Sequence, residues 1–347
     1  MRRPLARLVI SALVLAGMSG LAACGSEQEG DGTAADPLAL RLGHFPNLTH
    51  ATPVIGVEKK FFATALGDTV KLETKQFNAG PEAIEALFAG AIDATYIGPN
   101  PAINAYAQSD GQAVRIVAGA ASGGVSFIVK PGITKDGLRG KTIATPQLGN
   151  TQDVALRYWL KQRGLTTTKE GGGDVSIKPQ ANSDTVTAFA AGKIDGAWVP
   201  EPFASRLIAA GGVKLLDESE LWPDGLFVIT HLLVSKKFLD KHPTVVKNLV
   251  KGSVATNEWI NANPDEAQRT LNEALGRITG KPLDAKLTAA AWPSLKFTDD
   301  PIPSSLRDGA AHAVDAGLLD QVDLKDIYDL SFLNQVLADK GQPGVKS

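Results

Sequence analysis

Neutral hydrogen-bonding side chains stand at several points where a predicted strand gives way to a predicted helix. They belong to Asn100, Ser122, Asn150 and Thr151. Backbone N–H groups at a helix start have no partner inside the helix and carry the positive end of its dipole, so such junctions suit oxyanions. A ligand held by neutral donors can be released without breaking a buried ion pair. The pattern therefore predicts reversible binding of an oxyanion, and it indicates no catalytic residue.

Asn150 has a second interpretation. Asn150 and Asp153 have the spacing of a capping box, in which Asn150 caps its own helix. Asp153 would then weaken the attraction of that helix start for an anion. The sequence leaves both roles open.

Trp198 and Glu201 lie in the segment WVPEP, where the prolines indicate irregular backbone. The ring of Trp198 is predicted to lie against the apolar part of a ligand, with core packing as the alternative. Glu201 in a cleft would repel a simple anion, yet it could accept hydrogen bonds from the ammonium group of a zwitterion. Its alternative is a charge exposed to solvent.

Histidines offer little evidence of a metal site. His44 and His50 are six residues apart across a loop that contains Pro46, and no third ligand follows at a useful spacing. His50 is kept as a candidate polar contact to a ligand. His231, in an apolar strand, is expected to be a buried neutral imidazole.

Composition excludes several classes of function. Cys24 is the only cysteine, so disulfides, Cys-rich zinc sites and a thiol nucleophile in the body of the protein are excluded. The sequence has no Gly-x-Ser-x-Gly elbow and no glycine-rich phosphate loop. The formal net charge is −2, and it becomes about −5 without the first 23 residues, which argues against nucleic-acid binding.

Strand-like and helical patterns alternate through the first 230 residues, which predicts an α/β fold with a largely parallel sheet. In the last third the pattern becomes helical and strands are no longer expected. The expected strands are 38–43, 70–75, 94–97, 114–118, 126–130, 141–145, 175–178, 196–199 and 226–235. The expected helices are 81–89, 151–162, 243–261, one opening at Pro264, 304–316 and 331–338.

An internal similarity organises this pattern. Residues 85–102, EALFAGAIDATYIGPNPA, align with residues 187–204, TAFAAGKIDGAWVPEPFA, at an offset of 102. Each copy reads as a helix, a Gly-x-Ile-Asp turn, a short strand and a segment containing proline. The alignment predicts two similar lobes that bring strand ends to a shared crevice, where open α/β sheets bind ligands. Chance similarity of two common turns is the alternative.

The N-terminus has the features of a targeting signal. Three arginines precede an apolar stretch from Leu8 to Gly20, and Leu21-Ala22-Ala23-Cys24 follows. We expect residues 1–23 to be a signal peptide and Cys24 to be lipidated, as in bacterial lipoproteins. A plain secretory signal or an uncleaved anchor is the alternative. Residues 24–37 are polar and read as a flexible tether.

The order of four landmarks gives a resemblance to a known family. These landmarks are LGHFPNLTHA, AGPEAIEALFAGAIDATYIGPNPA, GKTIATPQLGNTQDVALRYWL and GKIDGAWVPEPFAS, within residues 38–340. In them the chain resembles the type II periplasmic-binding proteins of nitrate, sulfonate and taurine ABC importers. The resemblance implies two α/β lobes with a cleft and a two-strand hinge near Phe127 and Val228. One lobe would comprise 38–128 plus 230–347, and the other 129–229.

The resemblance also implies a pocket. The family often has Gly-x-Thr-Pro where this chain has Gly98-Pro99-Asn100-Pro101, so an amide replaces a hydroxyl. The residues expected to bind ligand are Asn47, Thr49, His50, Asn100, Ser122, Gly123, Gln147, Asn150, Thr151, Trp198 and Glu201.

The implied function is that of the extracytoplasmic, lipid-anchored solute-binding component of an ABC importer. Its expected ligand is a small sulfonate, a taurine-like zwitterion or a related oxyanion, and its expected partners are a permease and an ATPase. We expect a monomer that uses no cofactor or metal and contacts the membrane only through its lipid. Transport of nitrate or of a pyrimidine, an enzyme on the same scaffold, and a surface adhesin are the alternatives.

Overall fold

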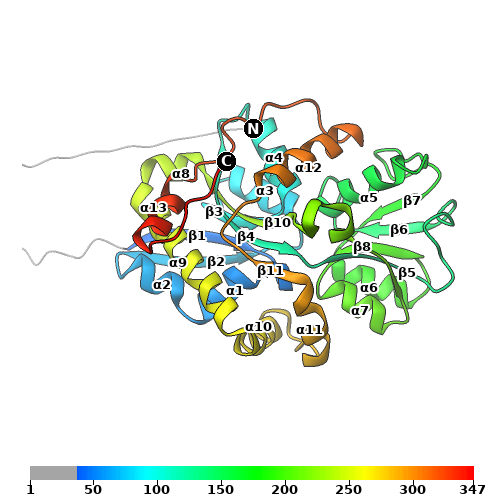
Figure 1. Cartoon of the computed structure of the whole chain (residues 1–347), viewed down its shortest axis with the longest axis horizontal. Coiled ribbons are helices and arrows are strands. Elements are labelled where there is room, and N and C mark those ends of the chain that lie inside the picture. Colours follow the sequence, from blue (N-terminus) through cyan, green and yellow to red (C-terminus); the bar gives the residue numbers. More distant parts are fainter. Residues whose placement is uncertain (1–36) are drawn as a thin grey trace, which may run out of the picture. The chain divides into compact units, whose positions relative to one another are not determined.

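Two β-sheets organise the part of the chain that this computed structural model describes, residues 37–347 (Figure 1). The predicted signal peptide, Cys24 and the tether up to Asp36 lie outside the described residues. The first sheet, in the order β11-β4-β10-β3-β1-β2, contains β1 (Leu38–His44), β2 (Val70–Gln76), β3 (Ala94–Ile97), β4 (Val114–Gly123), β10 (Val228–Ser235) and β11 (Leu295–Phe297). The second sheet, in the order β7-β6-β8-β5-β9, contains β5 (Val125–Val129), β6 (Thr142–Thr145), β7 (Ser176–Pro179), β8 (Gly196–Pro200) and β9 (Val213–Asp217).

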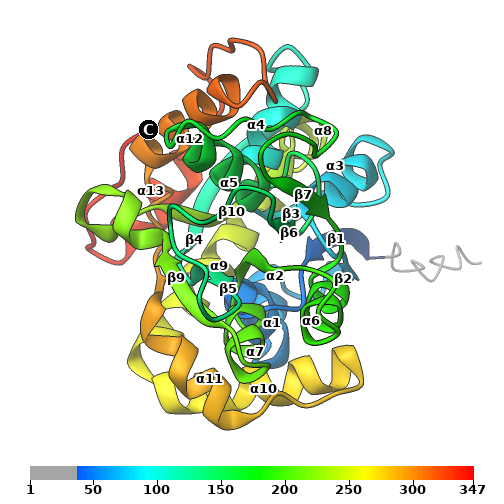
Figure 2. The ribbon, with the colours of Figure 1, turned by 90° about the vertical axis from the view of Figure 1, so that its right-hand side faces the viewer.

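Helices follow most of the strands and cover both faces of the sheets (Figures 1 and 2). Up to β10 they are α1 (Ala51–Glu58), α2 (Phe61–Leu66), α3 (Gly80–Phe88), α4 (Pro99–Gln108), α5 (Thr151–Lys161), α6 (Asn182–Ala190) and α7 (Phe203–Ala209). After β10 they are α8 (Lys236–Lys241), α9 (Pro243–Ala262), α10 (Pro264–Thr279), α11 (Ala285–Ala291), α12 (Pro303–Asp315) and α13 (Ser331–Asp339). Short 3-10 helices are η1 (Leu48–His50), η2 (Glu218–Leu221), η3 (Pro223–Gly225) and η4 (Trp292–Ser294). Among residues 37–347, no helix has the length and apolar character needed to cross a membrane.

The two sheets share one strand plan. β2-β1-β3-β10-β4 in the first sheet corresponds to β7-β6-β8-β5-β9 in the second. Three adjacent strands of each pair in parallel, and the fourth, β10 or β5, is antiparallel to both of its neighbours, so the fifth, β4 or β9, runs in the same direction as the first three. The predicted α/β fold is therefore confirmed. The expectation of a largely parallel sheet holds for the direction of four of these five strands in each sheet. Among the five, only β10 or β5 runs the opposite way, because it enters from the end of the other sheet.

The strands differ from the expectation at two further points, the end of β4 and the presence of β11. β4 continues beyond the expected end at Ala118 to Gly123, and β11 is a strand in the last third, where none was expected. β11 has three residues and pairs with β4 alone, so it is too short to show an alternating pattern.

The internal repeat corresponds to equivalent structure. The first residues of α3 and α6 are 102 positions apart in the sequence, and so are the first residues of β3 and β8. After each helix an aspartate binds the backbone of the parallel strand beside it. Asp93 Oδ2 accepts a hydrogen bond from the N–H of Arg41 at 2.9 Å, and Asp195 Oδ2 accepts one from the N–H of Thr142 at 2.9 Å. The Gly-x-Ile-Asp turn thus fixes the register of the neighbouring parallel strand, β1 in the first sheet and β6 in the second.

The chain passes from the first sheet to the second between β4 and β5. Gly123 and Gly124 have φ values of +80° and +71° there, in the left-handed region that glycine adopts without strain. The chain returns between β9 and β10. Residues 37–347 pack as one compact unit, so the division into lobes at residues 128–129 and 229–230 stays a prediction.

Candidate ligand-binding site

A small cavity lies where ends of strands from both sheets meet helix starts. Its volume is ≈ 20 Å³, enough for about one water molecule. A sulfonate with an organic tail is larger, so its entry requires the walls to move apart. The cavity is lined by Phe45, Asn47, Thr49, His50, Asn78, Ala79, Gly98, Pro146, Asn150, Thr151, Gln152, Asn182, Pro200 and Ile229.

Five helices start at this cavity. The residues that precede α1, α3, α4 and α5 line it, namely His50, Ala79, Gly98 and Asn150, and so does Asn182, the first residue of α6. None of the five helices has a hydrogen bond from its own N-cap side chain. Their positive dipole ends therefore converge on one small volume, an arrangement that attracts an anion.

The first-sheet wall is held by a local hydrogen-bond network. Asn47 Oδ1 accepts hydrogen bonds from Thr49 Oγ1 at 2.9 Å and from the N–H of His50 at 3.1 Å. His50 Nδ1 accepts one from the N–H of Phe45 at 3.3 Å, and the two rings lie 4.3 Å apart between centroids. Burial holds the pKa of His50 well below its ordinary value, so this wall is neutral.

The second-sheet wall consists of the first turns of α5 and α6. Asn150 Nδ2 donates to Gln152 Oε1 at 2.7 Å, and Asn150 Oδ1 accepts from the N–H of Gly80, at the start of α3, at 3.3 Å. Thr151 Oγ1 and Asn182 Oδ1 are buried and have no hydrogen-bond partner among the described residues. Because a buried polar atom without a partner is costly, these two atoms are suited to bind a ligand.

The capping-box interpretation of Asn150 is wrong. Its side chain accepts no hydrogen bond from a backbone N–H of its own helix, and Asp153 accepts instead from Thr145 Oγ1, the N–H of Gly149 and Arg157. Asp153 and Arg157 form a fully buried ion pair with 3.0 Å between Oδ2 and Nε. The negative charge of Asp153 is therefore compensated and opposes an anion at the start of α5 far less than expected.

Trp198 lies in the protein core. It stacks on Phe127 with 5.3 Å between ring centroids, contacts the edge of Trp159 and has no exposed surface. Its indole Nε1 donates to Glu218 Oε2 at 2.7 Å. The ring thus offers no face to a ligand here, and the core-packing alternative describes its position.

Glu201 is close to the site but turned away from it. Its backbone N–H donates to the carbonyl of Gly124 and so extends the pairing of β8 with β5, and its carbonyl accepts from the N–H of Leu48 in η1, which follows β1 of the first sheet. The carboxylate accepts from the N–H of Ser205 at 3.0 Å and so caps α7. Burial raises its pKa. The role predicted for it, binding an ammonium group, has no support in this conformation.

Four other predicted residues also lie outside the lining of the cavity. Asn100 Nδ2 donates to the carbonyl of Gly309 at 3.0 Å, and Ser122 Oγ accepts from the N–H of Phe227 at 3.3 Å. Gly123 pairs with Leu295 of β11. Gln147 is half-buried, and its Oε1 has no partner within the described chain. Asn47, Thr49, His50, Asn150 and Thr151 are thus the predicted residues that the structure brings together at the cavity.

The sequence analysis did not select Asn78 and Asn182, which supply polar groups to the cavity. Asn78 follows β2 and precedes α3, whereas Asn182 follows β7 and opens α6. The strand-to-helix criterion that selected Asn150 would have found both. The other lining residues that were not selected are Phe45, Ala79, Pro146 and Ile229, whereas Gly98, Gln152 and Pro200 lie in segments that the resemblance assigns to the pocket.

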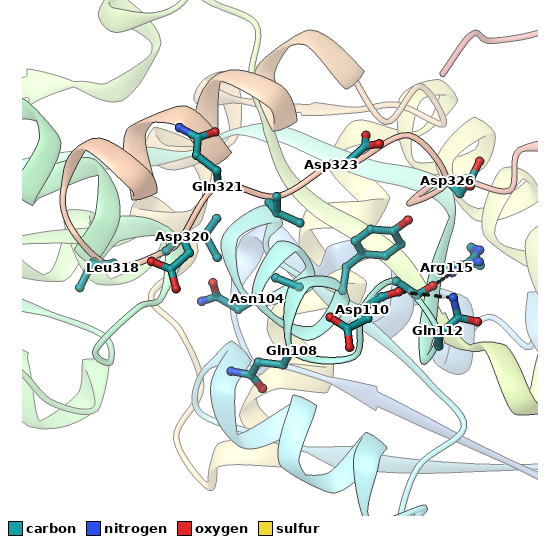
Figure 3. A pocket seen from close by; sticks show the side chains of 15 residues that line it. Asn104, Gln108, Asp110, Gln112, Arg115, Leu318, Asp320, Gln321, Asp323 and Asp326 are labelled. Atoms are coloured by element: carbon teal, nitrogen blue, oxygen red, sulfur yellow. Dashed lines mark hydrogen bonds between the residues drawn. The ribbon is translucent and has the colours of Figure 1, made fainter.

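A larger hollow of ≈ 730 Å³ does not suit an oxyanion (Figure 3). It is lined by the last residues of α4, where helix carbonyls carry the negative dipole end. Asp110, Asp320, Asp323 and Asp326 also face it, and Arg115 is the one cation of the lining. Within residues 37–347, no three His, Cys, Asp or Glu residues gather as a metal site would require.

Comparisons with known proteins agree on one group. The chain is 30% identical over 227 residues to the taurine-binding periplasmic protein of Escherichia coli, covering 64% of this chain and 67% of that protein. It is 24% identical to a putative aliphatic sulfonates-binding protein of Bacillus subtilis, covering 93% and 95% of the two chains.

Solved structures show the same fold. The alkanesulfonate-binding protein of Xanthomonas axonopodis, bound to MOPS, matches with a TM-score of 0.68 at 20% identity, covering 83% of this chain and 96% of that one. The nitrate-binding protein of Synechocystis matches with a TM-score of 0.71 at 17% identity, covering 87% and 89%. The model of the NMT1-like family matches residues 33–275. With most of its described residues inside that match, the chain belongs to the NMT1-like family.

Proposed function

We propose that this protein is the extracytoplasmic solute-binding component of an ABC importer and that it captures a small sulfonate at the cavity described above. The observation that carries the proposal is the convergence of five helix starts, without side-chain caps of their own, on one neutral cavity. The taurine-binding and aliphatic sulfonates-binding relatives support the same ligand class. We further propose that the protein acts as a monomer, is anchored by a lipid at Cys24 and delivers its ligand to a permease with an ATPase.

The lining favours an oxyanion with a short organic tail. Phe45, Pro146, Pro200 and Ile229 give the cavity an apolar side. Covering even part of such surface contributes about 1 kcal/mol or more, which nitrate cannot gain because it has no tail. Nitrate remains the second candidate, supported by the structural match to a nitrate-binding protein.

The position of Glu201 changes what is expected of taurine. The lining contains no carboxylate, so the ammonium group of taurine has only neutral acceptors such as Asn182 Oδ1. A carboxylate would have favoured taurine strongly over ethanesulfonate. We now expect these two sulfonates to bind with affinities that differ by less than about tenfold.

A thermal-shift screen tests the proposal. Taurine, ethanesulfonate, nitrate, sulfate and a pyrimidine would be compared, since a ligand at a hundred times its Kd stabilises the fold by about 2.7 kcal/mol. Thr151→Ala should weaken the binding of both sulfonates because Thr151 Oγ1 can donate to a sulfonate oxygen, and Asn182→Ala should weaken that of taurine because Asn182 Oδ1 can accept from its ammonium group. Glu201→Gln should leave the ratio of the taurine and ethanesulfonate affinities unchanged. A response to the pyrimidine alone would overturn the sulfonate assignment.

A further inference from the structure

We propose that a contact between α5 and α12, remote from the cavity, holds the walls of the site together and thereby sets its affinity for ligand. We define this contact, the α5–α12 latch, by Tyr158 and Lys161 of α5, His312 and Asp315 of α12, and Trp222 between η2 and η3. The inference rests on the proposed function, because it concerns the same site.

The latch is a close aromatic contact with a polar bond beside it. The rings of Tyr158 and His312 stack with 3.7 Å between centroids and 15° between planes. The centroid of the Trp222 ring lies 5.5 Å from that of His312. Lys161 Nζ donates to the carbonyl of Asp315 at 2.5 Å. Both helices present residues three apart, so one face of α5 meets one face of α12. Figures 1 and 2 show the two helices side by side.

Each helix of the latch is also connected to the cavity. α5 begins at Thr151, which lines the cavity, and Tyr158 lies about two turns further along the same helix. α12 is tied to α4 because Asn100 Nδ2 donates to the carbonyl of Gly309, and α4 starts beside Gly98 at the cavity. Asn100 is thus a positioning residue, and parting α5 from α12 would part the walls that contain Thr151 and Gly98.

The stack should carry most of the effect. Lys161 and Asp315 are each more than half exposed, and ion pairs at such positions contribute little. A stacked aromatic pair contributes more than its buried area alone. Because the cavity of ≈ 20 Å³ must open to admit a sulfonate and then close on it, the stability of the closed form enters the apparent affinity directly.

Tyr158→Ala tests the latch in two independent measurements, on chains with a normal far-ultraviolet circular dichroism spectrum. In the ligand-free protein, small-angle scattering should give a larger radius of gyration than for the unaltered chain. Isothermal titration with taurine and with ethanesulfonate should give a Kd weaker by about three- to tenfold. Tyr158→Phe, which keeps the ring, is the matched control and should change neither quantity.

The partner residue makes the test sharper. His312→Gln should reproduce both effects from the other helix, and Tyr158→Ala combined with His312→Gln should weaken binding little more than either change alone. Lys236→Ala, which breaks an ion pair within α8, should have no effect. An unchanged radius of gyration in both single variants would overturn the latch. If neither sulfonate binds the unaltered protein, the ligand assignment fails while the scattering measurement still decides the latch.

Discussion

The two sheets fix their site loops by different means although they share one strand plan. After β1, the loop before α1 is held by neutral contacts, with Asn47 accepting from Thr49 and His50. After β6, the equivalent loop before α5 is held by a charged group, because Asp153 accepts from the N–H of Gly149 and pairs with buried Arg157. Equivalent backbone therefore does not imply equivalent energetics. The second-sheet wall depends on one ion pair, whereas the first-sheet wall depends on several weak bonds.

The largest expected effect breaks that ion pair. Asp153→Ala leaves the guanidinium of Arg157 buried without its partner, and such losses cost about 3–5 kcal/mol of unfolding free energy. Urea denaturation measures it. Asp195→Ala is the control, because Asp195 has a partly exposed side chain and its lysine partner Lys130 is 3.4 Å away, so it should cost about 1 kcal/mol. Equal losses in the two variants would contradict the comparison.

A second prediction compares the pH dependence of stability caused by two buried acids, Glu218, which follows β9 of the second sheet, and Asp299, which follows β11 of the first. Burial raises the pKa of Glu218, which accepts from Trp198, to about 7, and that of Asp299, near β11, to about 6. A raised folded-state pKa means that the folded chain keeps its proton longer than the unfolded chain. Stability is therefore unaffected below the unfolded-state pKa and declines as pH rises, until the folded-state pKa is passed. Each group lowers the free energy of unfolding by about 3 kcal/mol over this pH range.

The pH windows separate the two acids. Glu218→Gln should remove the decline between about pH 4.5 and 7, whereas Asp299→Asn should remove one that ends near pH 6. Urea denaturation of both variants from pH 4 to 8 gives the two curves. Parallel curves for the unaltered chain and Glu218→Gln between pH 6 and 7 would show that this carboxyl does not titrate there.

The smallest expected effect on stability comes from Gly98→Ala, at the contact between the two walls of the cavity. A Cβ on Gly98 would lie 2.5 Å from Thr151 Oγ1, while the φ of Gly98, −72°, suits alanine. Gly98→Ala should change the unfolding free energy by less than about 1 kcal/mol because the walls can part, yet it should weaken sulfonate binding in calorimetry. Thr151→Ala in the same chain should relieve that contact. Gly172→Ala, in the loop before β7, is a control expected to bind normally, because its added Cβ would meet only Thr168 Oγ1, at an ordinary contact distance of 3.5 Å.

Sequence reasoning found the positions of the site better than the directions of its side chains. The strand-to-helix junctions at Asn47, Thr49, His50, Asn150 and Thr151 do meet at the cavity, because parallel strands bring their carboxyl ends to one edge. Trp198 could not be placed in this way. All five residues of β8 are buried, so no alternation distinguishes the side that faces the core.

Glu201 and Asn100 lie outside the lining of the cavity for a different reason. Both lie at the expected junctions, but each side chain satisfies a nearby backbone group, the N–H of Ser205 for Glu201 and the carbonyl of Gly309 for Asn100. The first bond is local, and the spacing from 201 to 205 at a helix start could have suggested it. The second joins residues 209 positions apart, and no local pattern contains that information.

The antiparallel strands β5 and β10 determine the order in which the chain can finish folding as it emerges during synthesis or export. All strands of the second sheet lie between Val125 and Asp217, so that sheet can be completed from one contiguous stretch. In the first sheet, β10 separates β3 from β4, and both keep an unpaired edge until residues 228–235 arrive. Unpaired edges invite association with other chains. A newly made chain thus has its greatest need of a chaperone in the interval before β10 is available to pair with β3 and β4. This strand follows β4 by more than a hundred residues in the sequence.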